Sequence, residues 1–371
     1  MRSVAGVVGT IAGAGLLGVV CAGIVYERVG EQTDRRRLPQ IGRSVDIGGR
    51  SLNIYCSGDG TPAVIFDSGA GEPGYAWSNI QPEIAKLTRA CWFDRAGSGW
   101  SDPGPFPRTS AAMSHDLHEL LHRAGVPPPY VLVGHSLGGL NARVYNGMYP
   151  SDVAGMVLVD AAHEDEPKRA PKFMLGHKLP RYLWHPMYIA AQAAWRVGLI
   201  RLLTPRAALP TDTANRTRNE IVDALRRQPK SVATLAGDAT APESYAEAHA
   251  AGGLGDKPLI VLTRGKVEPL TPNSTPMERQ SAAYEQVWMH EIQPQLVRLS
   301  TRGRQVIVAN SGHMIPDEAP EAVIDAIREV VTEVRAGGPG TPPSTGSKPI
   351  DCRFRRRPVK PGEGHCVRVL D

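Results

Sequence analysis

Several patterns typical of metal and nucleotide binding are missing from this sequence of 371 residues. Cysteine is scarce, with five residues, and these form neither a Cys-x-x-Cys pair nor a cluster with histidine at the spacing of metal ligands. A glycine-rich loop of the phosphate-binding type is also missing. We therefore expect a protein that uses no metal ion and no cofactor.

Basic residues are too few on the body of the chain to indicate nucleic-acid binding. The formal net charge is +5, but most of the excess lies in the tail after Ala336, where Arg353 and Arg355–Arg357 occur. A nucleic-acid-binding domain carries a basic stripe on the fold itself, so we expect no nucleic-acid partner. Hydrophobic residues make up 42% and charged residues 21% of the chain, which predicts a packed globular core.

The segment from Val4 to Tyr26 contains no charged side chain, whereas Arg28 and Arg35–Arg37 follow it. A helical run of this length is long enough to cross the hydrocarbon core of a membrane. A cleaved signal peptide is the alternative, but its apolar part is usually shorter and precedes a clear small-residue cleavage site. We interpret residues 1–26 as a transmembrane anchor or signal segment, favour a retained anchor, and expect residues 27–44 to form a connector.

A hairpin followed by alternating strands and helices is predicted from residue 45 onward. Val45–Ile47 and Ser51–Cys56 flank Gly48 and Gly49, which is a strong hairpin signal. Short apolar runs of the parallel-strand type then recur at Ala63–Phe66, Ala90–Phe93, Tyr130–Val133, Met156–Val159, Leu259–Leu262 and Gln305–Val308. Helical periodicity marks Ala111–Ala124, Gly139–Met148 and Pro320–Val334. This order predicts an α/β fold with a mostly parallel sheet and helices on both faces.

About a hundred residues separate the strand that ends at Val159 from the strand that starts at Leu259, too many for one helix and its turns. We expect residues 161–256 to form a helical cap over the carboxyl edge of the sheet, with a separate small domain as the alternative. Residues 336–347 are almost all Gly, Pro, Ser and Thr. We therefore expect one domain over residues 45–335, followed by a flexible linker and a basic C-terminal tail over residues 336–371.

Residues 134–138, with the sequence GHSLG, follow an apolar strand and open a helical segment. In this strand–turn–helix context the pattern predicts a nucleophile elbow. Its central residue, Ser136, is held in a strained conformation, so the residues two positions before and after it must lack side chains. The helix that follows supplies backbone N–H groups for a developing oxyanion. We predict that Ser136 is a catalytic nucleophile and interpret His135 as a packing residue.

Three spaced motifs together resemble the α/β-hydrolase fold-1 family. They are GHSLGG at residues 134–139, DRAGSGWS at residues 94–101 and SGH at residues 311–313. The resemblance extends over about residues 45–335. It implies a serine hydrolase with the α/β-hydrolase fold, in which a mostly parallel eight-stranded sheet has helices on both faces and a helical cap inserted after strand six.

The resemblance and the chain order imply roles for further residues. His313, just after the last predicted strand, is the expected base, because it and Ser136 lie at the carboxyl edge of the sheet. The N–H of Leu137 and, by similarity, the N–H of Ala70 in the loop Asp67–Gly71 are the expected oxyanion donors.

The acid of the triad has two candidates. Family members often place it after the strand before the last one, in a G-x-x-D pattern, where this chain has Gly265 followed by Glu268. Glutamate can orient an imidazole as aspartate does. Asp160, at the end of the preceding strand, corresponds to the displaced acid of some relatives and is alternatively a cap of the segment that follows. We favour Glu268 and keep Asp160 as the alternative.

A serine at the elbow favours acyl chemistry, because family members that displace an alkyl carbon, such as epoxide hydrolases, carry aspartate there. We expect a carboxylesterase or lipase that cleaves a small-molecule ester or a lipid-like substrate through an acyl-enzyme. The alternatives are a perhydrolase-like or C–C-bond hydrolase on the same triad, and a non-catalytic relative that binds a ligand.

The sheet order of the family makes the strand that ends at Cys56 and the strand that begins at Cys91 antiparallel neighbours, so the resemblance implies that these cysteines can form a disulfide. Cys352 and Cys366 are a second candidate pair, and free thiols are the alternative for both pairs. A disulfide indicates a body outside the reducing cytoplasm, whereas the arginines after the apolar segment favour the cytoplasmic side. We expect a membrane-anchored protein and favour an extracytoplasmic catalytic domain.

Overall fold

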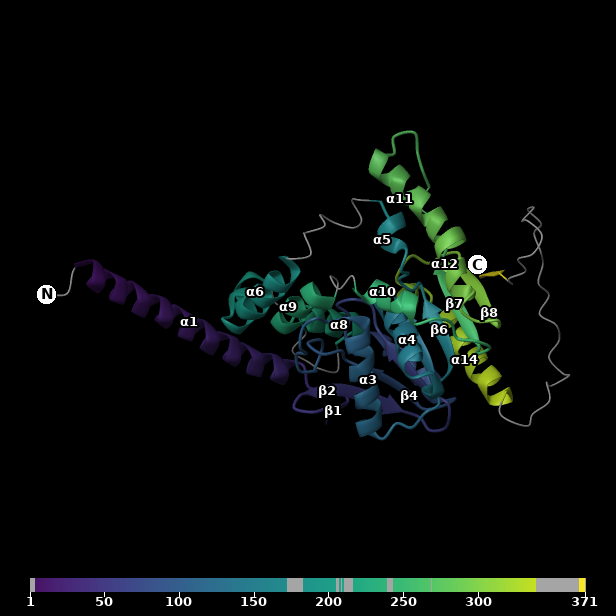
Figure 1. Ribbon diagram of the computed structural model, residues 1–371, viewed down its shortest axis with the longest axis horizontal. Coiled ribbons are helices and arrows are strands. Elements are labelled where there is room, and N and C mark those ends of the chain that lie inside the picture. Colours follow the sequence, from purple (N-terminus) through teal and green to yellow (C-terminus); the bar gives the residue numbers. More distant parts are fainter. Residues whose placement is uncertain are drawn as a thin grey trace.

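A single mixed sheet organises the fold (Figure 1). The computed structural model describes residues 4–171, 183–204, 207, 209, 216–238, 243–267, 269–337 and 367–370. Its nine strands have the order β1-β2-β4-β3-β5-β6-β7-β8-β9 within these residues. They are β1 Arg43–Asp46, β2 Ser51–Ser57, β3 Ala63–Asp67, β4 Ala90–Phe93, β5 Tyr130–His135, β6 Val153–Val159, β7 Leu259–Arg264, β8 Gly303–Val308 and β9 Val367–Leu370. β2 runs antiparallel to β1 and β4, and the other neighbouring strands are parallel.

Helices cover both faces of this sheet, except that α1 extends away from it (Figure 1). Outside the segment between β6 and β7 they are α1 Val4–Arg37, α2 Gln81–Ala85, α3 Ser110–Ala124, α4 Leu137–Met148, α11 Pro276–Val287, α12 Gln293–Val297, α13 Ile315–Glu318 and α14 Pro320–Ala336. Between β6 and β7 they are α5 Glu166–Arg169, α6 Trp184–Arg196, α7 Leu199–Leu203, α8 Arg218–Arg226, α9 Pro229–Asp238 and α10 Glu243–Ala250. Short 3₁₀ turns occur at Gly74–Trp77 and Pro150–Asp152, and a π-helical turn at Trp288–Ile292.

The central strands are buried along their whole length, as expected for a parallel sheet that is covered on both faces. Alternate residues of β5 belong to different cores. Leu132 packs in the core that contains Leu120 of α3, whereas Val131 and Val133 pack in the core that contains Ile327 of α14. Successive side chains of a strand point to opposite faces, so one apolar strand supplies both cores.

The predicted hairpin and the six predicted parallel-type strands are confirmed as β1–β2 and β3–β8. The predicted disulfide between β2 and β4 is present as well. Cys56 and Cys91 are directly paired in the antiparallel register of these strands and their sulfur atoms are bonded. The second candidate pair, Cys352 and Cys366, lies outside the described residues.

One of the described helices between β6 and β7, α10, packs against the sheet domain. α10 lies against α3 and α4. The Ser244 hydroxyl accepts a hydrogen bond of 2.9 Å from the N–H of Ser110, and the Glu247 carboxylate accepts one of 2.8 Å from the N–H of Ala111. These two bonds satisfy free N–H groups in the first turn of α3.

The expectation of eight strands is wrong, because β9 adds a ninth from the C-terminal tail. The sequence of β9, VRVL, shows no full alternation of apolar and polar residues. This segment nevertheless pairs in parallel with β8. The outer side of β8 would otherwise leave a row of unpaired N–H and C=O groups. Residues 338–366, which include most of the expected linker, lie outside the described residues.

The first part of the expected connector over residues 27–44 is helical, because α1 continues without a break to Arg37. Glycine and proline are missing between Glu31 and Arg37, and Pro39 then disfavours helical backbone at Leu38. The part of α1 from Ala12 to Arg37 contains a stretch that is long and apolar enough to cross a membrane.

Candidate active site

Ser136 lies in the turn between β5 and α4, with φ of 52° and ψ of −117°. A Cβ atom on Gly134 would lie 2.4 Å from the carbonyl oxygen of Gly138, and one on Gly138 would lie 2.3 Å from that of Asp67. Real Cβ atoms do not approach backbone so closely, so the two glycines are a steric requirement of this turn. The serine is thereby held at the carboxyl edge of the sheet.

Ser136 and Asp160 are the two non-glycine residues with positive φ in the part of the chain that the structure describes. They are neighbours in space, because the N–H of Ser136 donates to the carbonyl oxygen of Val159 and the N–H of Ala162 donates to that of Ser136. Such backbone costs about 1–3 kcal/mol per residue and is concentrated at functional sites. The strain therefore marks the carboxyl ends of β5 and β6.

Asp160 contacts His313 from the end of β6. Its Oδ2 atom lies 2.6 Å from Nδ1 of His313, which is in the loop between β8 and α13. The Asp160 side chain is fully buried, whereas 43% of the His313 side chain is exposed. A buried carboxylate thus holds one ring nitrogen, and the exposed imidazole is free to meet a substrate at the other.

Three further hydrogen bonds fix the Asp160 carboxylate. Trp288 Nε1 and the N–H of Arg264 donate to Oδ1 at 2.8 and 3.1 Å, and Arg264 Nη1 donates to Oδ2 at 2.6 Å. Burial alone raises the pKa of Asp160, but the hydrogen bond to His313 and the charge of Arg264 outweigh it and lower the pKa to about 2. The carboxylate is therefore ionised and its orientation is fixed.

Ser136, Asp160 and His313 line one cavity of about 890 Å³. Residues of α5 and α11 line it, together with the segment after β7. The lining is rich in charged and hydroxyl side chains, including Glu166, Arg264, Lys266, Thr271, Ser274, Glu278 and Ser281. Apolar residues such as Leu270 and Met277 also line it, and more of its exposed surface is apolar than polar. A substrate of mixed polarity therefore matches this cavity.

Glu268, the favoured acid in the sequence, lies outside the described residues. The structure instead places the alternative, Asp160, against the imidazole of His313. Arg264 and Trp288 could not be predicted as partners of this carboxylate, because neither belongs to a local motif. They reach Asp160 only after β6, β7 and the turn after α11 come together.

The two expected oxyanion donors lie on adjoining segments. Leu137 is the first residue of α4, and Ala70 is an exposed residue of the loop after β3. Arg95 stabilises this loop. Its Nη1 and Nη2 atoms donate to the carbonyl oxygens of Ser68 and Gly69, each at 2.6 Å. Its ion pair with Asp67, at 2.6 Å, completes the attachment. The DRAGSGWS motif was a sequence signal for Arg95, although its role required the tertiary structure.

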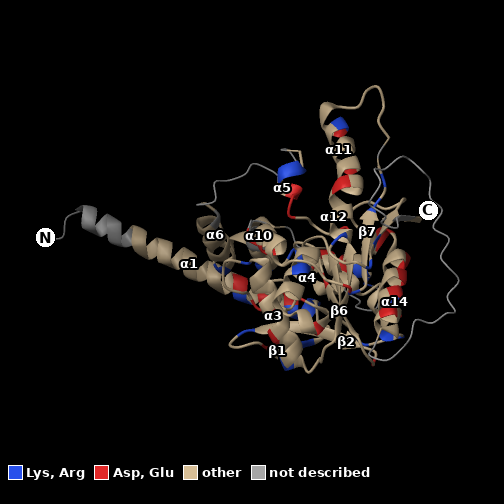
Figure 2. Ribbon diagram, turned by 45° about the vertical axis from the view of Figure 1, so that its right-hand side comes forward, with Lys and Arg blue, Asp and Glu red and all other residues tan. Residues whose placement is uncertain are grey.

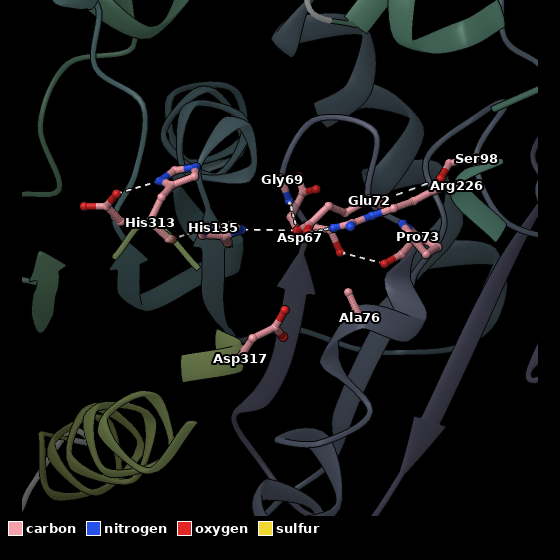
Figure 3. A network of polar contacts seen from close by, with 12 residues as sticks. Asp67, Gly69, Glu72, Pro73, Ala76, Ser98, His135, Arg226, His313 and Asp317 are labelled. Carbon is pink, nitrogen blue, oxygen red and sulfur yellow. Dashed lines mark hydrogen bonds and ion pairs between the residues drawn. The ribbon is translucent and has the colours of Figure 1, made fainter. Parts of the chain in front are cut away.

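A second polar network lies behind the site and joins four segments of the chain (Figure 3). Arg226, at the end of α8, pairs with Oε1 of Glu72 in the loop after β3. Oε2 of Glu72 lies 3.2 Å from Nδ1 of His135, and Nε2 of His135 lies 2.9 Å from the carbonyl oxygen of His313. The network therefore links α8, the loop of Ala70, the residue before Ser136 and the loop of His313.

His135 is buried, as expected of a packing residue, and both of its ring nitrogens also have polar partners. A carboxylate and a carbonyl oxygen face its two ring nitrogens, so only the doubly protonated ring donates to both. Burial lowers the pKa of His135, but the hydrogen bond and charge of Glu72 reverse this effect and raise it. Burial raises the pKa of Glu72, yet the hydrogen bond and charge of His135, with the charge of Arg226, lower it to about 2.

Comparisons with known proteins agree with this fold. The model of the Alpha/beta hydrolase family matches residues 64–326. An "AB hydrolase superfamily protein" of Gibberella zeae is 24% identical, over 74% of this chain and 87% of that protein. The uncharacterized protein YbdG of Bacillus subtilis is 27% identical over 37% of this chain, and the match spans 42% of YbdG.

Solved structures agree in fold. An esterase from Thermogutta terrifontis superposes with a TM-score of 0.51 at 22% identity, covering 80% of this chain and 99% of the esterase. At this level of identity the likeness concerns the architecture of the chain and leaves the chemistry to the residues of the site.

Proposed function

The chain belongs to the alpha/beta hydrolase family, and on that premise we propose that it is a serine hydrolase that cleaves a carboxylic ester. Ser136 is the nucleophile, His313 is the base and Asp160 is the acid of the triad. The observation that carries this proposal is the 2.6 Å contact between Asp160 and His313 in a cavity that Ser136 also lines. Glu268 is not required in this arrangement.

In this mechanism the hydroxyl of Ser136 attacks the ester carbonyl while His313 takes its proton. Asp160 holds Nδ1–H of the imidazole and stabilises the imidazolium that forms. The N–H groups of Leu137 and Ala70 stabilise the oxyanion of the tetrahedral intermediate. His313 then protonates the leaving alcohol, and water hydrolyses the acyl-enzyme by the same steps.

The character of the cavity supports a carboxylesterase more than a lipase. Glu166, Arg264 and Lys266 bring charge to the wall near the triad. Figures 1 and 2 place α5 and α11 away from α1, so the cavity is remote from the predicted membrane anchor. Both features favour a water-soluble ester of mixed polarity over a lipid that remains in the bilayer.

We also propose that α1 anchors the protein in a membrane with the catalytic domain on the extracytoplasmic side. The apolar run of α1 supports the anchor. The disulfide between Cys56 and Cys91 supports the side, because such bonds persist outside the reducing cytoplasm. Alkaline carbonate extraction of membranes, followed by protease treatment of intact cells, tests anchor and side separately.

A fluorophosphonate probe tests the catalytic proposal directly, because it reacts with an activated serine. We expect the full chain to be labelled and Ser136→Ala to be unlabelled. Ser281→Ala is the matched control, because Ser281 lines the same cavity without belonging to the triad, and it should be labelled as the wild type is. Absence of labelling in the folded wild-type chain would support a non-catalytic ligand-binding relative.

A series of p-nitrophenyl esters of increasing acyl length then tests the substrate class. We expect kcat/KM to be highest for short acyl chains and to fall for long ones. A steady rise of kcat/KM up to long chains would contradict the carboxylesterase proposal and favour a lipase.

A further inference from the structure

The short helix α7 has the reverse of the polarity expected at a water-exposed surface. Its arginine, Arg201, is buried with 5% exposure, whereas Leu202 and Leu203 are each 72% exposed and Leu199 is 45% exposed. Surface helices of soluble domains normally turn apolar side chains inward and charged ones outward. The reversal indicates that the outer side of α7 contacts something other than water.

The buried arginine of α7 attaches this helix to α1. Arg201 Nε and Nη2 donate to the two carboxylate oxygens of Glu27, each at 2.9 Å, and Nη1 donates to Asp34 at 2.6 Å. Trp195 Nε1, at the end of α6, also donates to Glu27 at 3.2 Å. A bidentate pair between buried partners is specific in geometry, so α7 is held at a defined level along α1.

Two glycines of α1 allow this close contact. A Cβ atom on Gly23 would lie 2.2 Å from the carbonyl oxygen of Val197, in the turn between α6 and α7. A Cβ atom on Gly30 would lie 2.3 Å from Nε of Arg201. Together with the ion pairs, these contacts place α7 beside residues 23–34 of α1.

The part of α1 that contacts α7 begins near the end of the apolar run of α1. At about 1.5 Å per residue, the run Val4–Tyr26 is about 35 Å long, enough to cross a hydrocarbon core of about 30 Å. The residues after Tyr26 would then lie in the headgroup layer. Val29 is 57% exposed there, and the exposed Arg28, Arg35 and Arg36 supply positive charge. Figure 2 shows charged residues where α1 meets the body.

We propose that α7 is an interfacial membrane surface: Leu199, Leu202 and Leu203 insert into the boundary between headgroups and acyl chains of the bilayer that α1 spans. The arginines of α1 at the same level attract the phosphates of anionic lipids. This inference rests on the proposed anchoring by α1. It adds a second, lateral contact, which fixes the orientation of the catalytic domain relative to the membrane.

Site-specific fluorescence in vesicles tests the inference on the full chain. Cys21, Cys352 and Cys366 are replaced by serine, and the bonded Cys56 and Cys91 are left in place. A single cysteine is then introduced and labelled with a nitrobenzoxadiazole dye. The vesicles consist of phosphatidylcholine and phosphatidylglycerol, with or without a lipid that carries a nitroxide quencher, either near the glycerol backbone or midway along an acyl chain.

Three positions make the measurement decisive. Leu202→Cys reports on α7, Leu17→Cys reports on the anchor, and Val369→Cys is the matched control, an exposed apolar residue of β9 at the sheet edge away from α1. Hydrolysis of a p-nitrophenyl ester checks that each variant is folded. We expect blue-shifted emission at positions 17 and 202, with strong quenching by the acyl-chain nitroxide at 17 and by the nitroxide near the glycerol backbone at 202, and neither effect at position 369.

The outcomes separate the inference from the anchor on which it rests. Quenching at position 17 but not at 202 overturns the role of α7 and leaves the anchor in place. A blue shift at 202 without quenching by lipid shows that protein covers the leucines, for example a second copy, and also overturns the inference. Absence of quenching at both positions overturns the anchor and the inference together.

Discussion

Asp160 Oδ2 lies 2.6 Å from Nδ1 of His313, although 153 residues separate the two in the chain. Asp160 is at the end of β6, one strand before the position that the G-x-x-D pattern indicates. The ends of β6 and β7 are adjacent in the parallel sheet, so a carboxylate from either strand starts near the loop of His313. Arg264 and Trp288 donate hydrogen bonds to the carboxylate at the end of β6 and favour its ionised form. Asp160 is therefore held in place to contact His313.

The first prediction concerns this contact. We expect Asp160→Asn to lower kcat by about 10³–10⁴-fold, because an amide no longer accepts from Nδ1–H and the imidazole loses its productive tautomer. Steady-state hydrolysis of a p-nitrophenyl ester measures the loss, and thermal unfolding checks the fold. Glu268→Gln is the matched control and should retain nearly the wild-type rate. The reverse result, with Glu268→Gln inactive and Asp160→Asn active, would show that Glu268 is the acid of the triad.

A second prediction concerns the contact between α8 and the loop of Ala70. Arg226→Met removes the ion pair with Glu72, and we expect kcat to fall by about tenfold with little change in KM, because oxyanion donors act mainly in the transition state. The melting temperature should change little, since the Arg226 side chain is 40% exposed. Arg227→Met is the control, because Arg227 pairs with Asp223 of its own helix. Equal kcat values for the two variants would contradict the prediction.

The third prediction is a dependence of stability on acid pH. The pKa of Glu72 is about 2 in the folded chain and 4.5 for the ordinary side chain. A lowered folded-state pKa stabilises the fold above pH 4.5, and this stabilisation is lost as the pH falls from 4.5 to about 2. Glu72→Gln cannot titrate, so its free energy of unfolding should change less over this range than that of the wild type.

Urea unfolding at several pH values between about 2 and 5 measures this difference. Glu83→Gln is the control, because Glu83 pairs with Lys86 at the exposed surface and solvent screens the pair. Its pH dependence should stay close to that of the wild type. A Glu72→Gln curve parallel to the wild-type curve would show that the buried pair with His135 contributes no acid sensitivity.

The fourth prediction concerns the disulfide between β2 and β4. It closes a segment with a sequence separation of 35, so replacing Cys56 and Cys91 by serine should lower the free energy of unfolding by about 3–4 kcal/mol. A reductant should destabilise the wild type but not this double variant. Cys21→Ser is the control and should leave stability unchanged, because Cys21 is exposed and free. Urea unfolding with and without dithiothreitol distinguishes these outcomes.

Local patterns in the sequence were sufficient for the strands, the turns and the elbow. The hairpin around Gly48 and Gly49 and the buried strands depend on residue periods and turn sterics within a few positions. The same holds for Ser136, whose place in the tight turn depends on Gly134 and Gly138. Its proposed role as the nucleophile awaits the labelling experiment.

Contacts between distant segments could not be predicted from the sequence. His135 offered no sign that Glu72 and the carbonyl oxygen of His313 would occupy its two nitrogens. The C-terminal β9 and the helical continuation of α1 to Arg37 were missed as well. β9 is stabilised by its pairing with β8, whereas the end of α1 combines helical propensity with the ion pairs of Glu27 and Asp34 to Arg201.

The sequence by itself determined which residues form β1–β8, where the chain makes its sharp turn at Ser136, and that an apolar helix precedes the domain. Only the tertiary structure decided which carboxylate holds His313 and that α7 turns its arginine toward α1 and its leucines outward. The physical reason is the range of the forces involved. Backbone sterics and hydrophobic periodicity act between near neighbours, whereas a buried ion pair forms only after packing brings distant segments together.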